Sequence, residues 1–177
     1  MHWMTHRTTI TLPDELVEKA EAINTSEAAR EGIRNECEAP GYYWFNSNRA
    51  RLPDRGLRAL TNGVVATYDT EQQVERLQFG DRVFLYVNDV GVVACGWVVA
   101  DGTAEPVPDV QKLYPSLDKE EYQADVYWEH VLPPQDAIDS QEIVAIANYP
   151  VHGSGTFTSV DSELGERLWS LLDGRSP

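Results

Sequence analysis

The chain has 177 residues and carries 29 acidic against 14 basic ones, a formal charge of −15. Its hydrophobic fraction of 42% is enough to build a core, so the composition excludes a disordered polyanion. No apolar run approaches the roughly 20 residues of a membrane-spanning helix, and the first residues do not resemble a signal peptide, so we expect a cytoplasmic protein. Only three of the basic residues are lysines, a composition typical of halophiles that accumulate salt.

Residues 1–39 predict a separate element made of one strand and two short helices. Residues 8–12 (TTITL) are β-branched and alternate, which indicates a strand. Pro13 suits the first turn of a helix, and Ser26 suits the cap of a second one. About 32 residues of this kind bury too little surface to fold alone, so the element needs a partner.

This element resembles the ribbon-helix-helix family in residues 7–16 and 25–30, RTTITLPDEL and TSEAAR. In that family the strands of two subunits pair into a ribbon that reads DNA. The resemblance implies a homodimer, and it implies that Arg7, Thr9 and Thr11 face the major groove. The residues themselves leave a second interpretation open. The glutamates of the element repel DNA, which favours a role in dimerisation or in packing against the rest of the chain.

An aromatic strand over residues 42–45 leads into a polar hinge and an arginine cluster. The cluster contains Arg49, Arg51, Arg55 and Arg58. Aromatic faces beside arginines suit a nucleobase and its phosphate. The alternative is a solvated loop in which the arginines pair with Asp54 and surface carboxylates.

The rest of the chain predicts a β-rich domain with small helices at its periphery. Strands are expected over residues 82–87, 90–100, 122–131 and 156–160, a strand or extended loop over 64–68, helical segments over 57–61, 71–77, 140–146 and 162–172, and an excursion loop over 101–116. This order predicts an α+β fold built on a small, partly closed barrel, and we assign residues 40–177 to it.

Catalytic and metal-binding patterns are absent from the sequence. No Gly-rich phosphate loop occurs, and Ser154 lacks the strand-to-helix frame of a nucleophile elbow. Glu120 and Glu121 lie in a charged stretch and indicate a solvated face. The histidines and cysteines show no metal-ligand spacing. We therefore expect a protein that is not an enzyme and that has no metal and no cofactor.

Five segments in order resemble the EVE domain of the PUA-like superfamily, a relative of the YTH domains that read methylated bases. They are residues 43–48 (YWFNSN), 77–86 (LQFGDRVFLY), 92–99 (VVACGWVV), 125–133 (DVYWEHVLP) and 157–172. The resemblance implies a small PUA-like barrel of mixed or antiparallel strands with peripheral helices. It also implies a base, modified or not, held in an aromatic pocket.

The resemblance and the aromatic pattern together predict a binding site. The pocket wall would contain Trp44, Ser47 and Asn48, with Trp97 and Trp128 as further aromatic contacts. Arg49 and Arg51 would meet the nucleic-acid backbone, with Arg55 and Arg58 on the same rim. We expect a non-enzymatic protein that binds DNA or RNA. A nucleotide- or small-molecule-binding barrel, an enzyme acting on RNA or nucleotides, and a plain dimerisation scaffold remain as alternatives.

Overall fold

The computed structural model describes residues 40–47, 57–69, 71–100, 102, 104–147 and 157–175. All of them belong to one compact unit, Cys37–Pro177. The predictions for the N-terminal element, with Arg7, Thr9 and Thr11, lie outside the described residues, as do those for Asn48, Arg49, Arg51 and Arg55.

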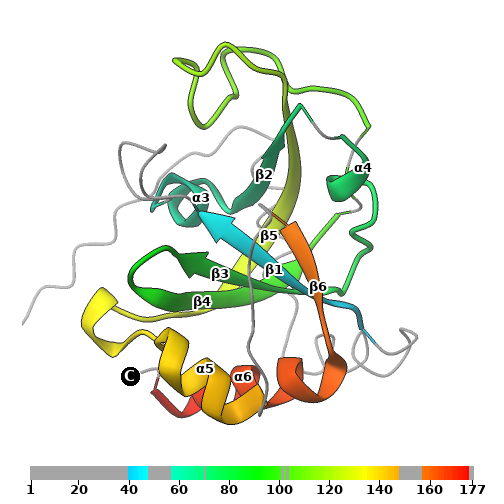
Figure 1. Cartoon of the computed structure of the whole chain (residues 1–177). Coiled ribbons are helices and arrows are strands. Elements are labelled where there is room, and N and C mark those ends of the chain that lie inside the picture. The colour runs from blue at the N-terminus through cyan, green and yellow to red at the C-terminus, as the bar shows by residue number, and fades with distance from the viewer. Residues whose placement is uncertain are drawn as a thin grey trace, which may run out of the picture. The chain divides into compact units, whose positions relative to one another are not determined.

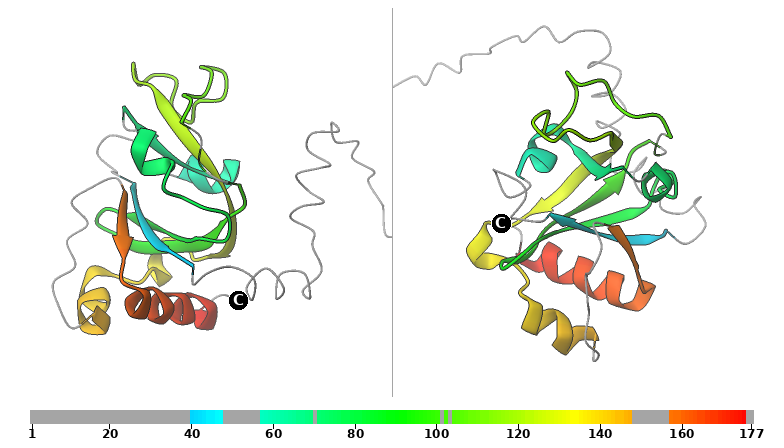
Figure 2. Two further views of the ribbon diagram at one scale, coloured as in Figure 1. Left: turned by 90° about the vertical axis from the view of Figure 1, so that its right-hand side faces the viewer. Right: turned by 45° about the horizontal axis from the view of Figure 1, so that its top comes forward.

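Six strands form one mixed sheet in the order β2-β5-β4-β3-β1-β6. They are β1 (Tyr42–Ser47), β2 (Val64–Tyr68), β3 (Arg82–Val87), β4 (Gly91–Val98), β5 (Glu121–Val131) and β6 (Phe157–Val160). The strands β1 and β3 run parallel, and every other neighbouring pair is antiparallel. The sheet curls into a partly open barrel (Figure 1; Figure 2). The predicted α+β fold with a small mixed barrel is therefore confirmed.

Short helices lie at the periphery of the sheet. They are α3 (Leu57–Asn62), α4 (Glu71–Val74), the 3₁₀ helix η1 (Pro134–Asp136), α5 (Ser140–Ala147) and α6 (Ser162–Arg175). Helices α5 and α6 lie together below the sheet, whereas α3 and α4 lie to the left and right of β2 in the upper part of the view (Figure 1). Asp161 caps α6, because its Oδ1 accepts from the backbone N–H groups of Glu163 and Leu164 at 3.0 and 3.3 Å. Within the described residues, no helix is long and apolar enough to cross a membrane.

The sheet separates two apolar clusters. The cluster on the inner face of the curled sheet includes Phe45, Val65, Val83, Leu85, Val98, Tyr122 and Val126. The cluster on the outer face, under α5 and α6, includes Tyr42, Trp44, Phe84, Cys95, Ile143, Leu164, Leu168 and Leu172. Successive side chains of a strand point to opposite faces, so Trp44 and Phe45 belong to different clusters. Below, "inner face" and "outer face" refer to these two sides.

The pairing of β4 with β5 is irregular beside a glycine. The register between β4 and β5 shifts between Cys95 and Gly96. A Cβ on Gly96 would lie 2.2 Å from the carbonyl oxygen of Tyr127, so only glycine fits this close approach. Gly91 begins β4 at φ +126°, a conformation that side chains rarely adopt. Both irregularities help the sheet to curl.

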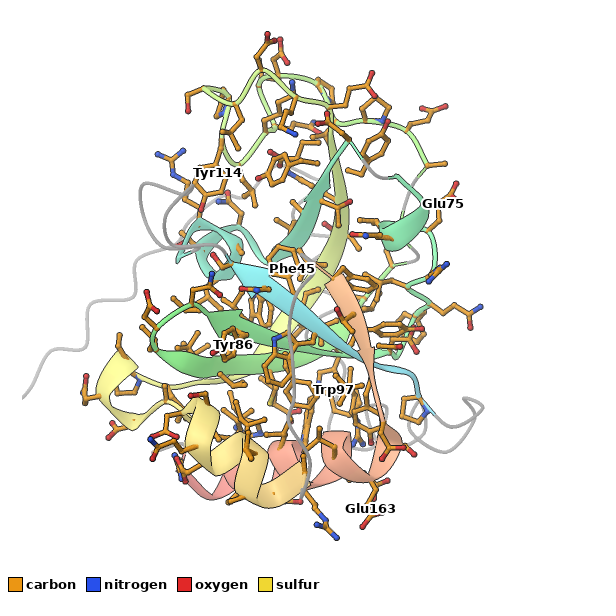
Figure 3. All side chains as sticks on the ribbon, in the orientation of Figure 1. Phe45, Glu75, Tyr86, Trp97, Tyr114 and Glu163 are labelled. Carbon is orange, nitrogen blue, oxygen red and sulfur yellow. The ribbon has the colours of Figure 1, made fainter. Side chains whose placement is uncertain are left out.

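The excursion loop expected over residues 101–116, which the structure describes at 102 and 104–116, returns to the body of the domain. Leu113 and Tyr114 are buried in a third apolar cluster together with Ala59 of α3 and Val64 and Ala66 of β2. Tyr114 lies at the end of the domain opposite α5 and α6 (Figure 3). The loop therefore packs against β2 and α3.

Candidate functional site

The tryptophans expected to surround one base lie on two different faces. Trp44 is 4% exposed and packs in the outer cluster, with its ring 5.0 Å from that of Tyr86. Trp97 contacts Trp169 of α6, with the ring centres 4.7 Å apart. Trp128 packs on the inner cluster. One base cannot touch both sides of a sheet, so the expectation that all three line a single site does not match this placement.

Trp97 belongs to an aromatic cage that an internal arginine already fills. The guanidinium carbon of Arg82 lies 5.2, 5.0 and 4.8 Å from the ring centres of Tyr42, Trp97 and Trp169. Its Nη1 also donates to the hydroxyl of Tyr42 at 2.6 Å. The Nε1 of Trp97 donates to Glu129 at 2.6 Å. Cation–π contacts of this kind stabilise the packing of α6 on the sheet.

The inner face carries a half-buried tryptophan whose indole is anchored. Trp128 pairs with Gly96 across the β4–β5 ladder. Its Nε1 donates to the backbone carbonyl of Ala59 in α3 at 3.1 Å. The only N–H of the ring is therefore used inside the domain, and what the indole can offer a ligand is its apolar surface.

Ser47 ends β1 with its side chain on the inner face, two residues after Phe45. It is 0% exposed, and its Oγ has no hydrogen-bond partner among the described residues. Burying an unpaired hydroxyl costs about 1–3 kcal/mol, so such a group calls for a reason. A ligand that bonds to this hydroxyl would supply one.

Arg58 has partners within the domain. Its Nη1 donates to the carbonyl of Leu113 at 2.7 Å, and its guanidinium carbon lies 5.3 Å from the ring centre of Tyr114. The sequence placed this arginine on a nucleic-acid-binding rim, and the structure places it against the excursion loop. The sequence did not predict Leu113 or Tyr114 as partners of Arg58, because the hydrogen bond to Leu113 joins residues 55 positions apart.

Glu121 is buried, contrary to the expected solvated face. It is 0% exposed at the start of β5, and its Oε1 accepts from the backbone N–H of Leu113 at 2.8 Å. The second buried carboxylate, Asp81, accepts from the backbone N–H groups of Gly41 and Gln78 at 2.8 and 2.9 Å. Both carboxylates therefore hold backbone segments together.

Other reactive groups of the domain are also engaged in structure. Burial raises the pKa of the Cys95 thiol well above its ordinary value, which keeps it protonated and unreactive. Within the described ranges, no group of three or more histidine, cysteine or acidic residues could hold a metal ion. The arrangement on the inner face offers stacking surface and a neutral hydroxyl.

No family model and no curated protein matches this chain. Solved structures match it in fold. The apo YTH domain of Toxoplasma CPSF4 has a TM-score of 0.57 at 16% identity, covering 78% of this chain and 88% of that one. The same domain in complex with a 7-mer m6A-modified RNA scores 0.56 at 16% identity, covering 78% and 93%.

A second YTH protein gives the same result. The YTH domain-containing protein mmi1, in complex with RNA, scores 0.54 at 10% identity and covers 76% of this chain and 82% of that one. At these identities the likeness establishes the fold. The described residues therefore share their fold with these YTH domains, which agrees with the fold that the EVE resemblance implied.

Proposed function

We propose that this domain binds nucleic acid and holds one base, modified or unmodified, on the inner face at Ser47 and Trp128. The observation that carries the proposal is the buried, unpartnered hydroxyl of Ser47. It stands directly before the arginine-rich segment. The fold is shared with a YTH domain solved with m6A-modified RNA, which supports a base as the ligand.

Each group has a defined task in this proposal. The apolar surface of Trp128 stacks on the base, which contributes about 1–3 kcal/mol. The hydroxyl of Ser47 forms a hydrogen bond with the edge of the base, which contributes about 1 kcal/mol. The adjacent Asn48 supplies a second polar contact. Trp44 and Trp97 take no part, because they face α5 and α6.

Phosphate contacts fall to Arg49, Arg51 and Arg55. The sequence joins their segment to Ser47 at one end and to α3 at the other, and α3 contacts Trp128. Most basic residues in the described part are already engaged with acids. These ion pairs are Lys112–Asp109, Lys119–Asp69, Arg167–Glu163 and Arg175–Glu142. The arginine segment therefore supplies the basic residues that directly follow Ser47 in the sequence.

Binding is favoured over catalysis by the character of the buried polar groups. Ser47 and Thr67 are neutral hydroxyls, the carboxylate Asp81 accepts from two backbone N–H groups, and Glu121 accepts from a backbone N–H through Oε1. General acid–base chemistry requires a titratable group within reach of the substrate. A neutral, aromatic site suits recognition.

The N-terminal element adds a second proposal. We propose that residues 1–39 mediate homodimerisation, with a ribbon of Arg7, Thr9 and Thr11 that contacts DNA. Sedimentation equilibrium of the full chain and of a chain beginning at residue 40 tests the first part. A dimer that persists without residues 1–39 would contradict it. Cytoplasmic location and adaptation to high salt stay predictions of the sequence.

Fluorescence anisotropy with short single-stranded oligonucleotides tests the main proposal. The panel contains DNA and RNA with unmodified bases, N6-methyladenine or 5-methylcytosine, measured at several salt concentrations. We expect one base to be preferred and Trp128→Ala to remove that preference. Calorimetry with free nucleosides is the matched experiment. Binding of free nucleosides without binding of any oligonucleotide would favour the small-molecule alternative.

A further inference from the structure

We infer that Arg58 and Glu121 are positioning residues, which hold α3 against the excursion loop so that α3 fixes the indole of Trp128. The inference rests on the proposed function, because it assigns a purpose to the orientation of Trp128. It also changes the role of Arg58, from a phosphate contact to a structural clamp. Three successive contacts link β5 to Trp128 through the loop and α3.

The first contact ties the loop to the sheet. Glu121 sits at the first position of β5 and is 0% exposed. Its Oε1 accepts from the N–H of Leu113 at 2.8 Å, and its carbonyl accepts from the N–H of Val107 at 2.8 Å. Its Oε2 is buried without a hydrogen-bond partner among the described residues, so the carboxylate depends on the bonds that Oε1 accepts and the loop gains a preferred position.

The second contact ties the loop to α3. Leu113 uses its N–H for Glu121 and its carbonyl for Arg58, so this one peptide segment links the strand to the helix. The guanidinium of Arg58 also lies over the ring of Tyr114, which is 2% exposed. A planar guanidinium can make the hydrogen bond and the ring contact together, whereas an ammonium group cannot stack.

The third contact ties α3 to the binding surface. The carbonyl of Ala59, the residue after Arg58, accepts from Nε1 of Trp128 at 3.1 Å. Helix α3 has only six residues, too few for stability of its own, so tertiary contacts decide where it lies. If Arg58 releases the loop, α3 shifts and the indole of Trp128 loses its anchor.

The structural arm of the test uses the free full-length protein. The chain has five tryptophans, so a ¹H–¹⁵N spectrum contains five indole signals, and Trp128→Phe identifies the one from Trp128. We expect Arg58→Ala to move this signal and to speed its exchange with solvent. Glu121→Gln, which keeps the shape of the side chain, should move it in the same direction. Arg76→Ala is the matched control, because it removes an exposed arginine of the same domain.

The binding arm separates positioning from phosphate contact. Arg58→Ala should weaken oligonucleotide binding about 2- to 10-fold, the cost of immobilising one more side chain on binding. The slope of log K against log salt, which is negative, should stay unchanged in Arg58→Ala. Loss of one phosphate contact would instead reduce the magnitude of that slope by about 0.7–0.9. Arg58→Lys keeps the charge and should weaken binding nearly as much as Arg58→Ala.

Each result decides the inference. An unmoved Trp128 signal in Arg58→Ala would overturn the positioning, whatever the binding result. A reduced salt slope, or full rescue by Arg58→Lys, would restore Arg58 as a phosphate contact and overturn it too. If the wild type binds no oligonucleotide while the Trp128 signal moves as expected, the proposed function fails and the control of Trp128 by Arg58 is upheld.

Discussion

Replacing Ser47 with alanine should make the domain more stable and its binding weaker. The side chain is 0% exposed and its Oγ has no hydrogen-bond partner among the described residues. Removing an unpaired buried hydroxyl relieves a desolvation cost of about 1–3 kcal/mol, and the cavity left by one oxygen offsets part of that gain. We expect a net gain of about 1 kcal/mol in the free energy of unfolding, which raises Tm by about 2–4 °C in a chain of this length.

The same change should act in the opposite direction on the ligand. If the hydroxyl bonds to the edge of a base, its loss removes about 0.5–1.5 kcal/mol of binding free energy. This corresponds to a Kd about 2- to 10-fold higher. A gain in stability together with a loss of affinity is the trade-off that functional sites typically show, so the combined result would mark Ser47 as a polar group kept for a ligand.

Thermal unfolding and anisotropy with the preferred oligonucleotide measure both effects. Ser159→Ala is the control, because Ser159 is exposed on β6 opposite Tyr43 and should change neither quantity. A fall in Tm for Ser47→Ala would mean that the hydroxyl has a partner in the folded protein, which refutes the reasoning. A higher Tm with unchanged affinity would remove Ser47 from the site.

Three further predictions concern the packing around the outer face. Gly165→Ala should lower the free energy of unfolding, measured in urea, by about 1–2 kcal/mol, because the new Cβ would lie 2.3 Å from the ring of Tyr42. This cost should exceed the gain from the better helix propensity of alanine. An unchanged urea midpoint would mean that α6 can shift. Arg82→Lys should destabilise the domain by about 1–3 kcal/mol, because the contacts of the planar guanidinium with three aromatic rings are lost. The affinity for oligonucleotides should be retained. Lost affinity at full stability would instead make the aromatic cage a ligand site. Burial, and then the charges of nearby acids, raise the pKa of the Tyr86 hydroxyl above its ordinary value of 10.0. The stability that this shift contributes is complete below pH 10.0 and is lost as the pH rises through the folded-state pKa. Between about pH 9 and 11 the urea midpoint should therefore fall less steeply in Tyr86→Phe than in the wild type.

Local patterns in the sequence were enough to place most elements of the sheet. The run over residues 82–87 predicts β3 with the bounds that the structure shows, and the predicted strand over 122–131 differs from β5 by one residue. These features depend on β-branched residues, alternation and turn chemistry within a few positions, so a short stretch of sequence contains all the information.

The faces on which side chains lie required the tertiary structure. Alternation shows that Trp44 and Phe45 point in opposite directions, but only the docking of α5 and α6 decides that Trp44 is core. Likewise Glu121 lies in a charged stretch, and only the return of the excursion loop buries it. The partner of Arg58 is 55 positions away, at Leu113. Charge and aromaticity can be read along a chain, whereas burial and partnership depend on which distant segments the fold brings together.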